Sequence, residues 1–149
     1  MKHLLLSILA LSFLATPAFA DTEVVHSVVG VQGYDLVSYH NNKRPLQGNG
    51  NHVATHEGVN YLFVDQANLD TFNKNPDKYL PAYGGWCAFG VAVNKKFIGD
   101  PTVWEIVDGK LYLNLDNNIK GMWVKDIPGH IKTANANWPK IKDKSPAEL

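Results

Sequence analysis

The sequence predicts an α+β domain with two β-hairpins, a short helix after the first hairpin and helices at its C-terminal end. Three observations predict this class. Residues 52–64 and 104–115 carry strand-like segments around short turns, residues 65–75 carry a helix start and stop, and apolar residues recur at helical spacing between 119 and 138. Because hairpins and helices come in blocks and do not alternate strictly, α+β is favoured over a parallel α/β sheet.

The first 20 residues have the pattern of a cleavable export signal. Lys2 gives a basic start, residues 4–14 are apolar, and the AFA sequence at 18–20 fits a cleavage site. The apolar run is shorter than the roughly 20 residues that a spanning helix needs. Asp21, not a cysteine, follows the cleavage site, which argues against a lipid anchor. We therefore expect a periplasmic or secreted protein without stable membrane insertion, in which residues 21–149 form one domain.

Residues 24–64 are expected to supply the first part of the fold. The valine-rich stretch 24–31 predicts an edge strand or an extended arm, and residues 33–39 predict a turn that leads into a short strand. The Asn-, Gly- and Pro-rich stretch 41–51 predicts a loop. Residues 52–64 then predict a hairpin, because they alternate with period two around the turn dipeptide at 57–58.

A helix is predicted directly after this hairpin. Asp65 is a suitable N-cap, and Val64 and Leu69 have the spacing of a hydrophobic staple. The helix should end by Asn75, since Pro76 disfavours α geometry in the residue before it. Residues 75–79 are then expected to form a turn.

The second half is predicted to contain another hairpin and two helices. Residues 82–93 fit either a buried strand or a short helix, and a helix start at 84–85 is favoured. Residues 99–101 predict a turn, and the Asp-Gly dipeptide at 108–109 is the strongest hairpin signal in the chain. An apolar stripe starts at 119, restarts as a second helix near 126–128 and runs to 139. The tail from about residue 140 is expected to be frayed.

Composition excludes several classes of function. The chain has 14 basic and 14 acidic side chains and no run of one sign, so nucleic acid is not an expected partner. It contains no phosphate-binding loop, no dinucleotide fingerprint, no nucleophile elbow and no acid/base pair at credible spacing. These features favour a protein that is not an enzyme. The expected partners are a metal donor or another protein.

Cys87 is the only cysteine in the chain, so it cannot form an intramolecular disulfide. It is a buried apolar group, a thiol paired with another molecule, a metal ligand or a reactive thiol. If a helix starts at 84–85, Cys87 lies in its first turn, where unpaired amides and the helix dipole stabilise a thiolate. A redox cycle would need an external thiol, because no second cysteine is present to resolve it.

Two histidines complete the candidate metal site. His52 and His56 have H-x-x-x-H spacing, but on a strand they lie about 13 Å apart and cannot share one ion. We therefore expect at most one of them, His56, to join Cys87, with His130 coming from the last helix. A thiolate with imidazoles suits copper(I) or zinc. A partner would have to supply the remaining ligands.

Several spaced motifs resemble the YHS domain family. The general family pattern is matched by YLF at 61–63, Asp65, Phe72, NP at 75–76 and Tyr79. Its exported bacterial subgroup is resembled by GYDLVSY at 33–39, YGGWCA at 83–88, DGKLYLN at 108–114, and the segment that opens with DIPG at 126–129 and closes with NWP at 137–139. The resemblance covers nearly all of residues 21–149, and each motif alone is weak.

The resemblance implies a scaffold associated with heavy-metal handling through three cysteines. Their positions correspond to Ser38, Val64 and Asn68, none of which can act as a thiolate. The expected function is therefore an exported YHS-type binding module that binds a soft metal, copper foremost, through Cys87 of the subgroup's own motif. The alternatives are a thiol-dependent redox protein using Cys87 and an interaction domain in which Cys87 is inert.

Overall fold

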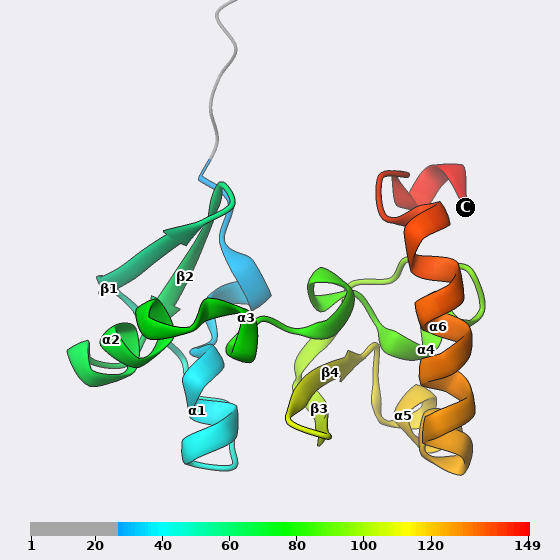
Figure 1. The fold of residues 1–149 in the computed structure, drawn as a ribbon, viewed down its shortest axis with the longest axis horizontal. Helices are drawn as coiled ribbons and strands as arrows, with labels where there is room; N and C mark the ends of the chain where they lie inside the picture. The colour runs from blue at the N-terminus through cyan, green and yellow to red at the C-terminus, as the bar shows by residue number, and fades with distance from the viewer. Residues whose placement is uncertain (1–26) are drawn as a thin grey trace, which may run out of the picture.

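The computed structural model describes residues 27–149, and the predicted export signal lies outside this range together with the start of the predicted arm. The fold is α+β, as predicted, with two separate two-stranded antiparallel sheets (Figure 1). Its helices and 3₁₀ turns, in chain order, are η1 (Gly30–Gly33), α1 (Leu36–Asn41), α2 (Gln66–Lys74), α3 (Pro76–Tyr79), η2 (Ala82–Gly85), α4 (Ala88–Ala92), α5 (Asn117–Trp123), η3 (Val124–Asp126), α6 (Ile127–Ile141) and η4 (Pro146–Glu148).

Both predicted hairpins form around their predicted turns. The strands β1 (Asn49–His56) and β2 (Val59–Phe63) flank Glu57 and Gly58, and β3 (Asp100–Val107) and β4 (Lys110–Asn114) flank Asp108 and Gly109. In each turn both central residues have positive φ, 49° and 78° in the first and 50° and 77° in the second. This is the two-residue turn whose twist matches that of the strands, which explains why Glu-Gly and Asp-Gly are effective here.

The strand β4 connects two hydrophobic cores. Leu111 and Leu113 belong to the first core, together with buried residues of α1, β2 and α2 such as Tyr39 and Phe72. Tyr112 belongs to the second core, with Trp123 and the inner face of α6. Successive side chains of a strand point to opposite faces, so β4 packs one core on each face. Figure 1 shows the corresponding division, with β1, β2 and α2 in one half and α4, α5 and α6 in the other.

The predicted short strand within residues 33–39 is wrong, because these residues begin helix α1. The side chain of Asp35 accepts hydrogen bonds from the backbone N–H groups of Val37 and Ser38, which caps the helix. The predicted loop at 41–51 is shorter than expected, since β1 starts at Asn49. The predicted turn at 75–79 contains the four-residue helix α3, with Pro76 in its first turn.

The helix predicted within residues 82–93, with its start at 84–85, begins later than predicted. Tyr83, Gly84 and Gly85 have positive φ and form η2, so they cannot open a right-handed helix. The helix α4 begins at Ala88, and Cys87 is its N-cap and not part of its first turn. Residues 99–101 are not a turn either. The N–H of Gly99 donates to the carbonyl of Gly85, and β3 starts at Asp100.

The predicted fraying of the tail from residue 140 is also wrong. The helix α6 follows its N-cap Asp126, within the predicted restart at 126–128, and continues past Pro139 to Ile141, whose side chain is buried in the second core. The ammonium group of Lys96 then donates hydrogen bonds to the carbonyls of Lys142 (3.0 Å) and Lys144 (2.7 Å). A basic side chain at a helix C-terminus satisfies carbonyls that have no partner within the helix, so it orders the end of α6.

A buried carboxylate joins three elements in the first half. Beyond its two bonds to α1, Asp35 accepts hydrogen bonds through Oδ2 from the backbone N–H of Val64 (3.0 Å) and from Nδ2 of Asn68 (2.7 Å). Its side chain is fully buried. The charge is compensated by four donors from α1, the end of β2 and the first turn of α2, which is what burial of a carboxylate requires.

Replacing Asp35 should therefore be costly. We expect Asp35→Ala to lower the free energy of unfolding by about 4 kcal/mol, because it leaves several buried donors without an acceptor. The control is Asp65→Ala, which removes the exposed N-cap of α2 and should cost only about 1 kcal/mol. Urea denaturation of both variants measures the difference. Equal losses would contradict the central role of Asp35.

Candidate functional site

Cys87 lies between α4 and the end of β4, and its sulfur is enclosed by polar backbone groups. The thiol has no exposed surface. Its Sγ accepts a hydrogen bond from the N–H of Gly90 (3.3 Å) and donates to Oδ1 of Asn114 (3.8 Å). The same Oδ1 accepts from the N–H of Phe89 (3.3 Å). The thiol and Asn114 together therefore cap the N-terminal end of α4.

The electrostatics of this position favour the neutral thiol. Burial raises the pKa of Cys87 above its ordinary value, although the backbone amides of Gly90, Leu115 and Phe89 act in the opposite direction. The side chain of Asp116 raises the pKa further. The sequence predicted that helix amides would stabilise a thiolate, but the loss of solvent outweighs them here.

The two histidines predicted as ligands lie on different elements, His56 on β1 and His130 on α6. His56 lies at the end of β1 in the first half and packs edge-on against Phe72, with ring centroids 6.2 Å apart. His130 is closer to α4, where its ring packs edge-on against Phe89 at 5.1 Å. Its Nδ1 lies 2.9 Å from the carbonyl oxygen of Trp123, so Nδ1 carries the proton and donates.

The groups that hydrogen-bond to the Cys87 thiol are not the ligands that a soft metal prefers. The hydrogen-bond partners of the thiol are Asn114 and a backbone amide, and neither is an imidazole. Within residues 27–149, no three His, Cys, Asp or Glu side chains are arranged to hold one metal ion. Copper or zinc binding through Cys87 remains a prediction that solution measurements can test.

The three positions at which the resemblance places the family's cysteines do converge. The N–H of Ser38, the N–H of Val64 and the side-chain amide of Asn68 all donate to the carboxylate of Asp35, at distances of 3.2, 3.0 and 2.7 Å. Ser38 is three residues from Asp35, so its bond is part of the local helix cap, whereas Val64 and Asn68 are 29 and 33 residues from Asp35 in the sequence. In this chain the point of convergence is a buried hydrogen-bond network.

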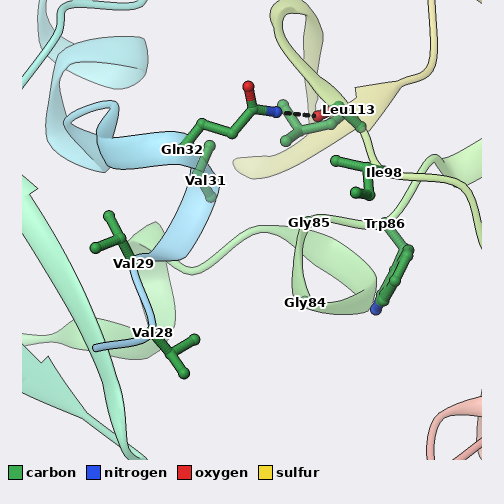
Figure 2. A pocket seen from close by; sticks show the side chains of 10 residues that line it. Val28, Val29, Val31, Gln32, Gly84, Gly85, Trp86, Ile98 and Leu113 are labelled. Carbon is green, nitrogen blue, oxygen red and sulfur yellow. Dashed lines mark hydrogen bonds between the residues drawn. The ribbon is translucent and has the colours of Figure 1, made fainter. Parts of the chain in front are cut away.

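An apolar groove lies beside Cys87 at the junction of the two halves (Figure 2). Its volume is about 410 Å³. The groove is lined by Val28, Val29, Val31 and Gln32 on one side, by Gly84, Gly85, Trp86, Ile98 and Gly99 on the other, and by Leu113 of β4. None of these side chains carries a charge, a hydroxyl or a thiol. The groove therefore offers hydrophobic contact but no nucleophile and no acid or base.

Close backbone approach shapes the inner end of the groove. A Cβ atom on Gly99 would lie 2.6 Å from both the carbonyl oxygen of Gly85 and Cβ of Leu113, so only glycine allows this approach. Gly85 has φ of +86°, and a Cβ atom there would contact Val31 and Leu113, which both line the groove. The glycines thus leave open a space that side chains would otherwise fill.

Lys96 fixes the tryptophan that lines the groove. Its ammonium group lies 4.7 Å from the ring centroid of Trp86 and 5.8 Å from that of Trp138. Its hydrogen bonds to the end of α6 hold it there. Neither Lys96 nor the groove was found from the sequence, because the contributing segments are up to 85 residues apart in the chain and share no local motif.

Removal of the Lys96 charge should destabilise the fold. We expect Lys96→Met to lower the free energy of unfolding by about 2 kcal/mol, because two charge-assisted hydrogen bonds and a cation–π contact are lost. Lys95→Met, at an exposed neighbouring position, should change stability by less than about 0.5 kcal/mol. Thermal and urea unfolding measure both variants. Similar values for the two would show that the Lys96 contacts contribute little.

The raised pKa of Cys87 predicts a specific pH dependence. The unfolded thiol ionises first as pH rises past its ordinary value of about 8.5, whereas the folded thiol keeps its proton. The thiol's contribution to stability is therefore complete at lower pH and is lost as pH rises. Between pH 7 and 10, the native protein should lose more stability than Cys87→Ala. A relative gain would mean that the folded state holds a thiolate.

Comparison with known protein families, with curated proteins and with solved structures found no match to this chain. No helix within residues 27–149 has the length and apolar character required to cross a membrane. The features that bear on function are therefore the buried Cys87 thiol, the hydrogen bonds of Asp35 and the apolar groove.

Proposed function

We propose that this protein is an exported, non-enzymatic binding module of the YHS type, in which Cys87 is structural and the apolar groove is the binding surface. The observation that carries the proposal is a preformed apolar groove beside a thiol that has no exposed surface. Concave apolar pockets of about 300–1,000 Å³ are the usual form of small binding sites.

The groove supports binding without catalysis. Acid–base and nucleophilic chemistry need titratable or nucleophilic side chains within reach of the bound molecule. The lining contains only apolar residues, glycines and one glutamine. Two of its side chains are also unusually exposed for their type: Ile98 is 68% exposed and Val28 is 54% exposed. A contiguous apolar surface of this kind is typical of an interaction site.

The membership in the YHS family is supported by the convergence at Asp35. If the family's cysteines occupy one site, the residues at these positions lie near one another. In this chain the backbone N–H groups of Ser38 and Val64 and the side chain of Asn68 contact the same carboxylate. The export signal supports a location outside the cytoplasm. In this proposal the chain keeps the scaffold of the family. Its binding site is the groove and not a set of metal-binding cysteines.

Copper(I) titration tests the proposal against its metal-binding alternative. The chain from Asp21 and its Cys87→Ala variant would compete with bicinchoninate for copper(I). We expect neither protein to withdraw a stoichiometric equivalent, because the thiol is sealed and lacks imidazole partners. Withdrawal of one equivalent by the native chain but not by Cys87→Ala would replace this function with soft-metal binding.

Alkylation of the folded protein tests the redox alternative. Iodoacetamide should modify Cys87 only as fast as the protein unfolds, and the urea-unfolded chain provides the rate of a fully accessible thiol. Rapid modification of the folded chain at pH 7 would instead favour a thiol-dependent redox protein.

A further inference from the structure

The groove has the chemistry of a site for a small neutral molecule. Every side chain of its lining is uncharged, and the nearby ammonium group of Lys96 already donates to the carbonyls of Lys142 and Lys144. An ionic group placed in the groove would therefore lose its hydration without gaining a counter-charge from the lining. A purely apolar molecule loses nothing of this kind and gains the hydrophobic contribution of the buried area. The absence of charge in the lining therefore disfavours anions and cations alike.

Some of the polar backbone groups at the inner end of the groove are already paired. The N–H of Gly99 donates to the carbonyl of Gly85, and Nε2 of Gln32 donates to the carbonyl of Gly99, as Figure 2 shows for the latter bond. The N–H of Cys87 donates to the carbonyl of Phe97. An extended peptide would need free strand-edge groups to pair with, and a sugar would need several free polar groups. The bonds of Gly99 and Gln32 leave fewer such groups free in these segments.

One wall of the groove is held in a strained conformation. Val31 has φ of +47° and Gln32 has φ of +51°, and the left-handed region is unfavourable for a β-branched residue such as valine. The side-chain bond from Gln32 to Gly99 and the bond from Nε2 of Gln47 to the carbonyl of Gln32 hold this wall in place. Strain of this kind tends to occur where a site has to be shaped before its ligand binds.

From the uncharged lining, the partly paired backbone and the strained wall, we propose that the groove binds one small, neutral, apolar molecule. This inference rests on the proposed function and names the class of ligand for the same site. The occupant inserts between Val28 and Ile98, which lie on opposite sides of the opening, and contacts Trp86 and Leu113 further in.

A matched pair of fluorescent probes tests the ligand class. N-phenyl-1-naphthylamine is neutral and apolar, and 8-anilino-1-naphthalenesulfonate has the same ring skeleton with one sulfonate added. The native chain from Asp21 should bind the neutral probe with one site per chain and the sulfonate at least about tenfold more weakly. Equal or tighter binding of the sulfonate would overturn the inference.

Variants then locate the site. Val28→Trp should fill the groove and Ile98→Ser should remove an apolar contact, and each should weaken binding of the neutral probe, by about tenfold and about threefold respectively. The controls are Val93→Trp and Val124→Ser, at positions that are 51% and 47% exposed but outside the groove. Losses of the same size in the controls, or no loss in the groove variants, would overturn the inference.

The outcomes separate this inference from the proposed function. If the neutral probe fails to bind while copper(I) and iodoacetamide also fail to react with Cys87, the ligand class is wrong but the module with a structural cysteine remains. If the native chain sediments as a dimer and Val28→Trp as a monomer, a second copy of the chain occupies the groove and the inference is also wrong. Stoichiometric copper(I) uptake through Cys87 would instead overturn the proposed function, whatever the probe does.

Discussion

The double burial of β4 is the constraint on which the rest of the structure depends. All four residues from Leu111 to Asn114 are buried, which is unusual for a strand of a two-stranded sheet. Burial is possible because the α1–α2 layer covers one face and α5 with α6 covers the other. The end of this strand then positions the inner end of the groove and the contacts of Cys87. Leu113 is at the inner end of the groove and forms an isolated β-bridge with Cys87. The side chain of Asn114 accepts a hydrogen bond from the Cys87 thiol.

The state of Cys87 follows from this packing. A cysteine at a helix N-terminus is often activated, because amides and the helix dipole favour its thiolate. Here the amides are present, but the end of β4 removes water from the sulfur, and a buried anion without a counter-charge is unfavourable. The same position that makes Cys87 a cap for α4 also buries its sulfur, and this burial raises the pKa of its thiol. In the proposed function the binding surface is instead the groove, which is lined by Gly84, Gly85 and Trp86 of the loop that precedes Cys87.

The sequence predicted the turns and helix ends that depend only on neighbouring residues. The turn dipeptides at 57–58 and 108–109, the caps Asp65 and Asp126 and the stop at Pro76 all depend on neighbours within a few residues, and the structure has both hairpins and these helices. Predictions failed where distant residues decide. Asp35, which caps the helix that starts at Leu36, also accepts bonds from Val64 and Asn68, about 30 residues away in the sequence. The C-terminal tail is ordered because Lys96 reaches it. The burial of Cys87 depends on Asn114, 27 residues further along the chain, and no local pattern marks that contact.

The position of Trp86 has an optical consequence. Its indole lines the groove while the Lys96 ammonium group lies over the same ring. The excited state of indole is sensitive to a nearby positive charge, so a molecule that enters the groove and shifts the ring changes its emission. A version of the chain that keeps Trp86 and replaces the other three tryptophans with phenylalanine would then signal occupancy by itself, and natural extracts could be screened without any attached dye.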